Sequence, residues 1–133
     1  MRIGLAGGGT DVSPYSDEFG GAILNATISH YAYAVIEPCP ENNITVRAAD
    51  IKQQECYELQ NELPINGTLD LHKGVYNRIK KDFGITQKSF QLTTYVDAPA
   101  GSGLGTSSTL MVAIIGAFAH WFGRRRHRCE SLQ

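Results

Sequence analysis

The spacing of apolar and polar residues along the chain predicts a mixture of short strands and two longer helices. The clearest strand covers residues 89–97, where alternate positions form one face (Phe90, Leu92, Thr94 and Val96). Further strands are predicted at residues 2–6, 28–36, 44–48 and 55–59. We expect the first of these to be buried, the second to be buried on both faces, and the last two to form an antiparallel hairpin.

Two segments show the 3.6-residue period of an α-helix. Residues 69–83 place apolar side chains at every fourth position and are expected to expose their basic ones (Lys73, Arg78, Lys80 and Lys81). Gly84 is suited to end this helix, because glycine readily adopts the left-handed conformation found after a helix. The second helix runs from about residue 105 to residue 122 and carries almost no charge. We therefore expect it to be buried in this domain or against a second one.

The composition is that of a globular domain. The chain has 133 residues, of which 42% are hydrophobic and 19% charged, enough for one hydrophobic core. Four of the twelve basic residues lie in the last ten positions, so the rest of the chain has eight basic against twelve acidic residues. This balance argues against nucleic acid as a partner of the body of the chain.

The cysteines and the lengths of the apolar runs indicate the cellular compartment of the protein. Three cysteines without a CxxC spacing indicate reduced, unpaired thiols. The chain does not start with the pattern of a signal peptide, and no apolar run is long enough to cross a membrane. We therefore expect a cytoplasmic protein.

A glycine-rich segment, residues 97–109, lies between the clearest strand and the apolar helix; we call it the second glycine loop. Its glycines alternate with other residues and precede four hydroxyl side chains (Gly101, Gly103 and Gly105, then Thr106, Ser107, Ser108 and Thr109). Glycine permits positive φ angles and close approach of a ligand to the backbone. A helix that starts here directs free N–H groups and the positive end of its dipole into the loop. The segment therefore predicts a site for a nucleotide phosphate.

A similar segment follows the strand predicted at residues 2–6; we call residues 7–11 the first glycine loop. Its sequence is Gly-Gly-Gly-Thr-Asp. Three consecutive glycines fit a tight turn after the strand, and they equally fit a close approach of a ligand. The sequence leaves both interpretations open.

The second glycine loop differs from three common phosphate motifs. A Walker A motif requires a lysine, and none lies between Tyr95 and Phe122. A dinucleotide-binding motif would have a third glycine at Ser108 and an acidic residue about twenty positions further on, where this chain has the end of the helix and an arginine run. The glycine-rich loop of protein kinases lies in a strand hairpin and not at the start of a helix.

The second glycine loop resembles the second motif of the GHMP kinases, roughly P-x-G-x-G-L-G-S-S, with Thr106 where serine is commoner. The superfamily is named for galactokinase, homoserine kinase, mevalonate kinase and phosphomevalonate kinase. The first motif is matched by Arg2 and Asp11, which lie nine positions apart, while Gly8 and Gly9 replace the Glu-His pair of galactokinases. This form, with the run that follows it to Thr27, is similar to the branch that phosphorylates heptose phosphates and fucose.

The resemblance implies that ATP lies with its phosphates over the second glycine loop. The residues implied to contact them are Pro99, Gly101, Ser102, Gly103, Leu104, Gly105, Thr106, Ser107 and Ser108. Ser107 matches the serine that helps to hold Mg²⁺, and Arg2 matches the arginine whose charge stabilises the transferred phosphoryl group. The residues implied to bind the sugar are Gly8, Gly9, Thr10 and Asp11.

The resemblance also implies an α+β fold like that of ribosomal protein S5 domain 2, with a mixed, mostly antiparallel sheet and helices on one side. Residues 1–123 are then the N-terminal ATP-binding domain of a kinase, incomplete at both ends, and residues 124–133 are a basic tail outside the family. The family's catalytic aspartate, acidic magnesium ligand and third glycine-rich motif lie beyond the second motif, outside this chain. The expected function is ATP-dependent phosphorylation of a hydroxyl group on a sugar or sugar phosphate, with this chain inactive alone.

Two alternatives stay open. In place of a kinase fragment, one is a non-catalytic module that binds a nucleotide or sugar, and the other is an interaction unit that uses the apolar helix and the basic tail. The partners expected from the resemblance are ATP and a sugar or sugar phosphate, with neither nucleic acid nor membrane. The helix over residues 105–122 is expected to be covered by a second copy in a homodimer or by a missing C-terminal domain.

Overall fold

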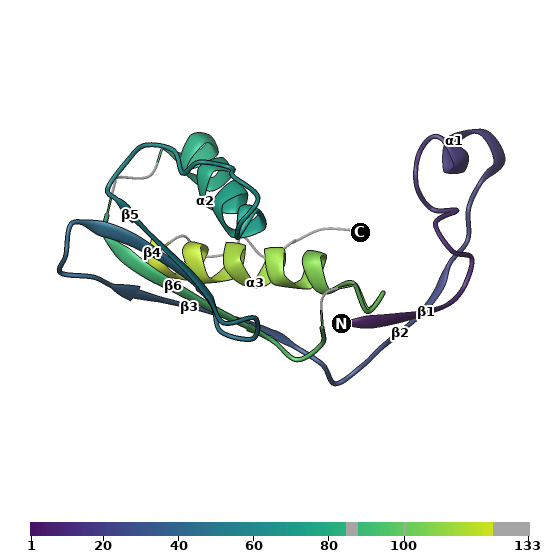
Figure 1. Cartoon of the computed structure of the whole chain (residues 1–133). Helices are drawn as coiled ribbons and strands as arrows, with labels where there is room; N and C mark the ends of the chain where they lie inside the picture. The colour runs from purple at the N-terminus through teal and green to yellow at the C-terminus, as the bar shows by residue number, and fades with distance from the viewer. Residues whose placement is uncertain (85–87, 100, 124–133) are drawn as a thin grey trace.

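The computed structural model describes residues 1–84, 88–99 and 101–123. The predicted basic tail, residues 124–133, lies outside the described residues. The elements follow in the order β1 (Arg2–Ala6), α1 (Tyr15–Phe19), β2 (Leu24–Thr27), β3 (Ala32–Pro38), β4 (Asn43–Ala48), β5 (Gln53–Glu58), α2 (Asp70–Phe83), β6 (Phe90–Val96) and α3 (Thr106–Trp121) (Figure 1). This is the α+β class that was expected.

The main sheet contains four strands in the order β3-β6-β4-β5. β3 pairs antiparallel with β6, and β4 pairs antiparallel with β5, which confirms the predicted hairpin. β4 and β6 run parallel. The sheet is therefore mixed and mostly antiparallel, and its inner strand β6 leads directly into the second glycine loop.

Helices α2 and α3 cover one face of this sheet and enclose the hydrophobic core (Figure 1). The ring of Phe90 on β6 lies 5.3 Å from that of Tyr76 on α2 and 5.4 Å from that of Phe118 on α3. The buried aliphatic residues around these rings are Ile44, Val46, Val75, Ile79, Leu92 and Ile114. Burial of these apolar side chains is the main force that holds the helices on the sheet.

The other face of β3 is open, so the prediction that this strand is buried on both faces is wrong. Tyr33 and Val35 remain 50% and 53% exposed, whereas Ala32, Ala34 and Ile36 pack beneath the helices. The alternation itself is correct, but no layer of the described residues covers the second face. Alternation shows which side chains share a face and cannot show whether a face is covered.

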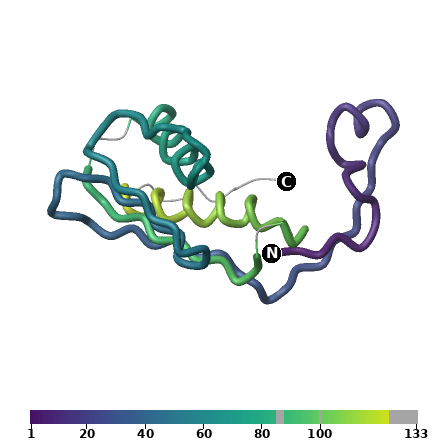
Figure 2. The backbone as a smooth tube through the Cα atoms, in the orientation of Figure 1, coloured from purple at the N-terminus to yellow at the C-terminus, as the bar shows by residue number. Residues whose placement is uncertain are grey.

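Strands β1 and β2 form a separate two-stranded antiparallel hairpin that carries α1 away from the main sheet (Figure 2). The prediction that residues 2–6 are buried is wrong, because all five residues of β1 are exposed. A two-stranded hairpin has no second layer to bury its side chains. The sequence pattern also missed β2, which has only four residues.

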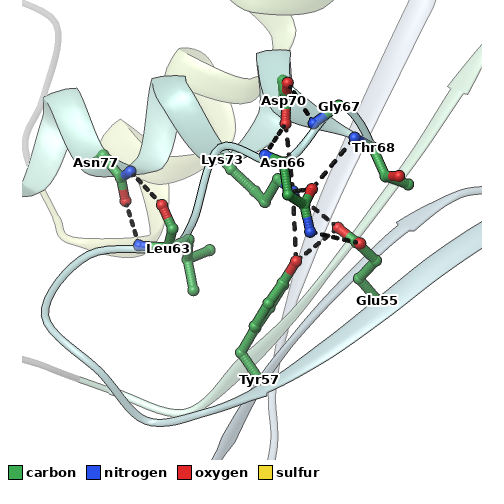
Figure 3. Close-up of polar contacts among 9 residues, drawn as sticks. All are labelled: Glu55, Tyr57, Leu63, Asn66, Gly67, Thr68, Asp70, Lys73 and Asn77. Atoms are coloured by element: carbon green, nitrogen blue, oxygen red, sulfur yellow. Dashed lines mark hydrogen bonds and ion pairs between the residues drawn. The ribbon is translucent and has the colours of Figure 1, made fainter.

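The prediction that Lys73 faces solvent is wrong, because its side chain has no exposed surface. Its ammonium group donates hydrogen bonds to Glu55 (2.9 Å), Tyr57 (3.3 Å) and Asn66 (2.6 Å) (Figure 3). The carboxylate of Asp70 lies 3.4 Å away. Since Glu55 and Tyr57 belong to β5, the ion pair joins the edge of the sheet to α2. We call these five residues the Lys73 cluster.

Helix α3 is buried along one side only. Leu110, Ile114 and Phe118 face the sheet, while Met111, Val112 and Ile115 are exposed. The inner side is therefore buried within this domain, as expected. No helix of the described residues has both the length and the apolar character needed to cross a membrane.

Candidate functional site

The second glycine loop is tied to the main sheet at its first residue. The backbone N–H of Asp97 donates to the carbonyl of Tyr31 (3.1 Å), and the Asp97 carboxylate accepts from the N–H of Tyr31 (2.7 Å). A turn follows, in which the N–H of Ser102 donates to the carbonyl of Pro99 (3.3 Å). These contacts fix where the loop leaves β6.

All three alternating glycines of this loop adopt positive φ angles. The values are 81° at Gly101, 74° at Gly103 and 73° at Gly105. Residues with a side chain rarely adopt this conformation, because the Cβ atom clashes with the backbone. The local backbone therefore requires the glycines, as the sequence predicted.

The loop ends at the N-terminus of α3, a helix of sixteen residues. The first N–H groups of a helix have no carbonyl partner within it, and the helix dipole gives this end a partial positive charge. No acidic side chain lies in the first turn to neutralise that charge. Ser107 and Ser108 are exposed there, and the hydroxyl groups of Ser102 and Thr106 lie 3.3 Å apart. This end of the helix is suited to bind an anion.

Arg2 brings the start of the chain against the second glycine loop. Its backbone N–H donates to the carbonyl of Leu104 (3.2 Å), and its Nη1 donates to Oδ1 of Asn25 on β2 (2.6 Å). A Cβ atom at Gly105 would lie 3.8 Å from Cγ of Arg2, so the arginine stem passes close to the loop. The guanidinium group is thereby held beside the predicted phosphate site.

A cleft of about 320 Å³ joins the two glycine loops. Gly8 of the first loop and Gly103 of the second both line it, together with Arg2 and Asn25. Sequence reasoning missed Asn25, and the only signal was a polar residue within an apolar run. The cleft therefore has a cation on one wall and glycine backbone on two others.

The structure shows the tight backbone approach at the first glycine loop, while the approach of a ligand stays a prediction. A Cβ atom at Gly7 would lie 2.1 Å from the carbonyl oxygen of Ala22, and one at Gly21 would lie 1.9 Å from that of Thr10. These two glycines allow two backbone segments to touch. Gly8 and Gly9 have open space where a side chain would lie.

The remaining two residues of this loop, Thr10 and Asp11, differ in their contacts. The hydroxyl group of Thr10 donates to the carbonyl of Ala22 (3.2 Å) and so helps to hold the loop closed. Asp11 follows it and is exposed. Its carboxylate is therefore accessible to a ligand.

The part of the chain that the structure describes contains no group of three or more His, Cys, Asp or Glu residues that could hold a metal ion. Mg²⁺ usually binds one or two carboxylates and completes its shell with water and phosphate oxygens. The hydroxyl of Ser107 fits as one ligand of an ion that is held mainly by a bound nucleotide. It does not make a metal site alone.

Comparison with known proteins gives a family match and similar sequences. Residues 70–133 match the family model described as the GHMP kinases N terminal domain. The chain is 47% identical over 121 residues to a D-glycero-alpha-D-manno-heptose 7-phosphate kinase of Campylobacter jejuni, covering 91% of this chain and 36% of that protein. It is 30% identical over 148 residues to an L-fucokinase/L-fucose-1-P guanylyltransferase of Bacteroides fragilis, covering 92% of this chain and 15% of that protein.

Comparison with solved structures also finds kinases with this fold. The crystal structure of a D-glycero-D-manno-heptose 1-phosphate kinase from Bacteroides thetaiotaomicron superposes with a TM-score of 0.86 and 54% identity, over 92% of this chain and 40% of that chain. A mevalonate kinase from Methanococcus jannaschii gives a TM-score of 0.63 at 18% identity, over 69% of this chain and 31% of that chain, and so supports the fold alone. The chain spans well under half the length of each of these relatives.

Proposed function

Because the chain belongs to the GHMP kinases, whose N-terminal domain it carries, we propose that it is the nucleotide-binding part of a kinase that phosphorylates a sugar phosphate with ATP. The observation that carries the proposal is the contact of Arg2 with the second glycine loop. It brings the cation and the backbone of both glycine loops together around one cleft, and Gly105, the residue that precedes α3, lies beside Arg2. Phosphoryl transfer depends mainly on positioning and on electrostatic stabilisation of phosphate oxygens, and these groups provide both.

Each loop has a separate task in this proposal. The backbone of residues 101–106 and the N-terminus of α3 hold the phosphates of ATP. Arg2 lies beside the phosphoryl group that moves, where its charge offsets the negative charge of the transition state. Ser107 adds a hydroxyl ligand to Mg²⁺, an ion that would neutralise phosphate charge when bound.

The first glycine loop faces the sugar. The exposed carboxylate of Asp11 accepts hydrogen bonds from sugar hydroxyl groups, and Thr10 keeps the loop in place. The open space at Gly8 and Gly9 leaves room for a large substrate such as a heptose phosphate. The names of the two heptose kinase relatives differ in the position of the phosphate, 7 or 1, so the class of substrate is proposed here and the reacting hydroxyl is not.

The reaction breaks the bond between the γ-phosphorus atom of ATP and its bridging oxygen, and it forms a new bond to the sugar oxygen. The hydroxyl proton must leave to a base. We assign no base among the described residues, and the chain spans 36% and 40% of its two heptose kinase relatives. We propose that the base and the acidic metal ligand belong to the part of these relatives that the chain does not cover, and that this part also covers the exposed side of α3.

Calorimetric titration with Mg·ATP, followed by a turnover assay with heptose 7-phosphate, tests the proposal. We expect measurable binding of Mg·ATP without turnover. Arg2→Gln should weaken binding about tenfold, because it removes the only charge that the described cleft offers to phosphate. Arg47→Gln is the matched control, since Arg47 is exposed on β4 outside the cleft, and it should leave binding unchanged.

Three results would contradict the proposal. Absence of Mg·ATP binding by the unmodified chain would favour an interaction unit over a nucleotide-binding module. Rapid turnover by this chain alone would show that the base lies within it. Binding without turnover by a longer protein that contains the whole kinase would instead favour a non-catalytic module.

A further inference from the structure

Two polar side chains, Arg2 and Asn25, line the cleft between the glycine loops, and they are the only ones among the described residues that line it. The other lining residues offer backbone groups or apolar side chains (Gly4, Leu5, Ala6, Gly8 and Gly103). Arg2 has a role in the proposed function, whereas Asn25 has none. What Asn25 adds to the cleft follows from its place in the β1–β2 hairpin and from the charge of its side chain.

Asn25 reaches Arg2 diagonally across the hairpin. Gly4 lies directly opposite Asn25, and Arg2 lies opposite Thr27. Residues two apart on a strand share a face, so Arg2, Gly4 and Asn25 are on the same side of the hairpin. A Cβ atom at Gly4 would lie 3.6 Å from Oδ1 of Asn25, so the amide oxygen passes over a position that has no side chain. This path allows the hydrogen bond of 2.6 Å from Nη1 of Arg2 to Oδ1 of Asn25.

The partner of Arg2 is neutral, and this distinguishes Arg2 from other basic residues of the chain. Within residues 1–84, 88–99 and 101–123, Lys73 and Arg78 form ion pairs with carboxylates, whereas Arg2 forms none. A carboxylate in place of Asn25 would hold the guanidinium group more strongly, but it would also offset the charge that attracts a phosphate. An amide oxygen accepts the hydrogen bond without adding a negative charge. Asn25 therefore fixes the direction of Arg2 and leaves its charge available.

We propose that Asn25 is a positioning residue that directs the guanidinium group of Arg2 toward the terminal phosphate of ATP. This inference rests on the proposed function, in which the second glycine loop holds the phosphates and the first glycine loop faces the sugar. Arg2 lines the cleft together with Gly8 of the first loop and Gly103 of the second, so the phosphate that it meets is the one nearest the sugar. A side chain that is already ordered loses less conformational entropy when a ligand binds. Asn25 therefore strengthens the binding of ATP and not that of ADP, which lacks the terminal phosphate.

Calorimetric titration with Mg·ATP and with Mg·ADP measures this difference. Asn25→Ala should weaken the binding of Mg·ATP about fivefold, because the ligand itself must then order the side chain of Arg2. The same substitution should leave the binding of Mg·ADP unchanged. When Arg2→Gln is already present, Asn25→Ala should have no further effect on Mg·ATP, because no guanidinium group remains to be positioned.

Asn25→Asp separates this role from general support of the hairpin, since aspartate has nearly the same shape and keeps the acceptor oxygen. Its carboxylate would offset the charge of Arg2, so the binding of Mg·ATP should weaken about tenfold, as expected for Arg2→Gln. Asn42→Asp is the matched control, because it adds the same charge at an exposed position between β3 and β4, outside the cleft. It should leave the affinities for both nucleotides unchanged.

Equal binding of Mg·ATP by the wild-type chain and by Asn25→Ala would overturn the inference and leave the proposed function intact. An equal loss of Mg·ATP and Mg·ADP binding in Asn25→Ala would also overturn it, since Asn25 would then only support the hairpin. Binding of Mg·ATP by Asn25→Asp that is as tight as in the Asn42→Asp control has the same meaning. A wild-type chain that binds no Mg·ATP would contradict the proposed function itself, and this inference with it.

Discussion

Replacing Lys73 with methionine should destabilise the chain far more than replacing an exposed lysine of α2. Methionine is close to lysine in length and shape, so the change removes the charge and keeps the packing. It leaves the carboxylates of Glu55 and Asp70 without the ammonium group that lies 2.9 Å and 3.4 Å from them. Asn66 and Tyr57 also lose a donor.

The size of the effect follows from how well water can replace the lysine. Breaking a fully buried ion pair costs about 3–5 kcal/mol, because it leaves an isolated charge. Here the side chains of Glu55 and Asp70 are 20% and 35% exposed, so water can partly hydrate both carboxylates. We therefore expect Lys73→Met to lower the free energy of unfolding by about 2–3 kcal/mol.

Urea unfolding followed by tryptophan fluorescence measures this value. Trp121 is the single tryptophan of the chain, and its ring lies 5.4 Å from that of Phe90 in the core. Lys81→Met is the matched control, because Lys81 is exposed on the same helix and its loss should cost about 0.5 kcal/mol or less. A loss for Lys73→Met that is no larger than the control would refute the role of the Lys73 cluster.

The same cluster predicts a pH range. Burial lowers the pKa of Lys73, but its hydrogen bonds to Glu55 and Tyr57 outweigh this and raise the pKa above its ordinary 10.5. Partial burial raises the pKa of Glu55, but hydrogen bonds from Tyr57 and Lys73 outweigh this and lower the pKa below 4.5. The lysine contribution is lost only above about pH 10.5 and the glutamate contribution only below about pH 4.5. The effect of Lys73→Met should be constant between these limits.

Two further predictions concern the core and the first glycine loop. Burial lowers the pKa of His72 below 6.5, so stability should fall as the pH drops below about 6.5, and His72→Gln should flatten this slope in urea unfolding at two pH values. A slope unchanged by the substitution would contradict this. Gly21→Ala should expose the first glycine loop to proteolysis, because the new Cβ would meet the Thr10 carbonyl, whereas Gly9→Ala should not. Equal cleavage of both variants would show that the contact is unimportant.

The sequence predicted those parts of the fold whose cause is local. The alternation around Phe90 and the period of α2 follow from burial of one face, and the φ angles of Gly101, Gly103 and Gly105 follow from the backbone of a single loop. These features need no knowledge of distant residues. They were accordingly correct in position and type.

The errors have the opposite origin. Lys73 was expected to be exposed because helical periodicity shows only its own helix, and its partners Glu55 and Tyr57 lie on β5. Asn25 was missed because its importance comes from contact with Arg2, on the neighbouring strand. Even the meeting of Arg2 with the second glycine loop was available only through the family resemblance. Sheet order produces such contacts, and spacing along the chain does not determine sheet order.

The two halves of the cleft differ in how firmly they are held, and this difference should couple the binding of the two ligands. The second glycine loop is anchored by Asp97 to a four-stranded sheet with a buried core. The first glycine loop is carried by an isolated two-stranded hairpin, a structure that is only marginally stable by itself. Arg2 bridges the two halves through Leu104. In the proposed function, a phosphate bound at the second loop would attract Arg2 and so stabilise the hairpin that carries Asp11, which means that nucleotide and sugar should each strengthen the binding of the other by the same factor.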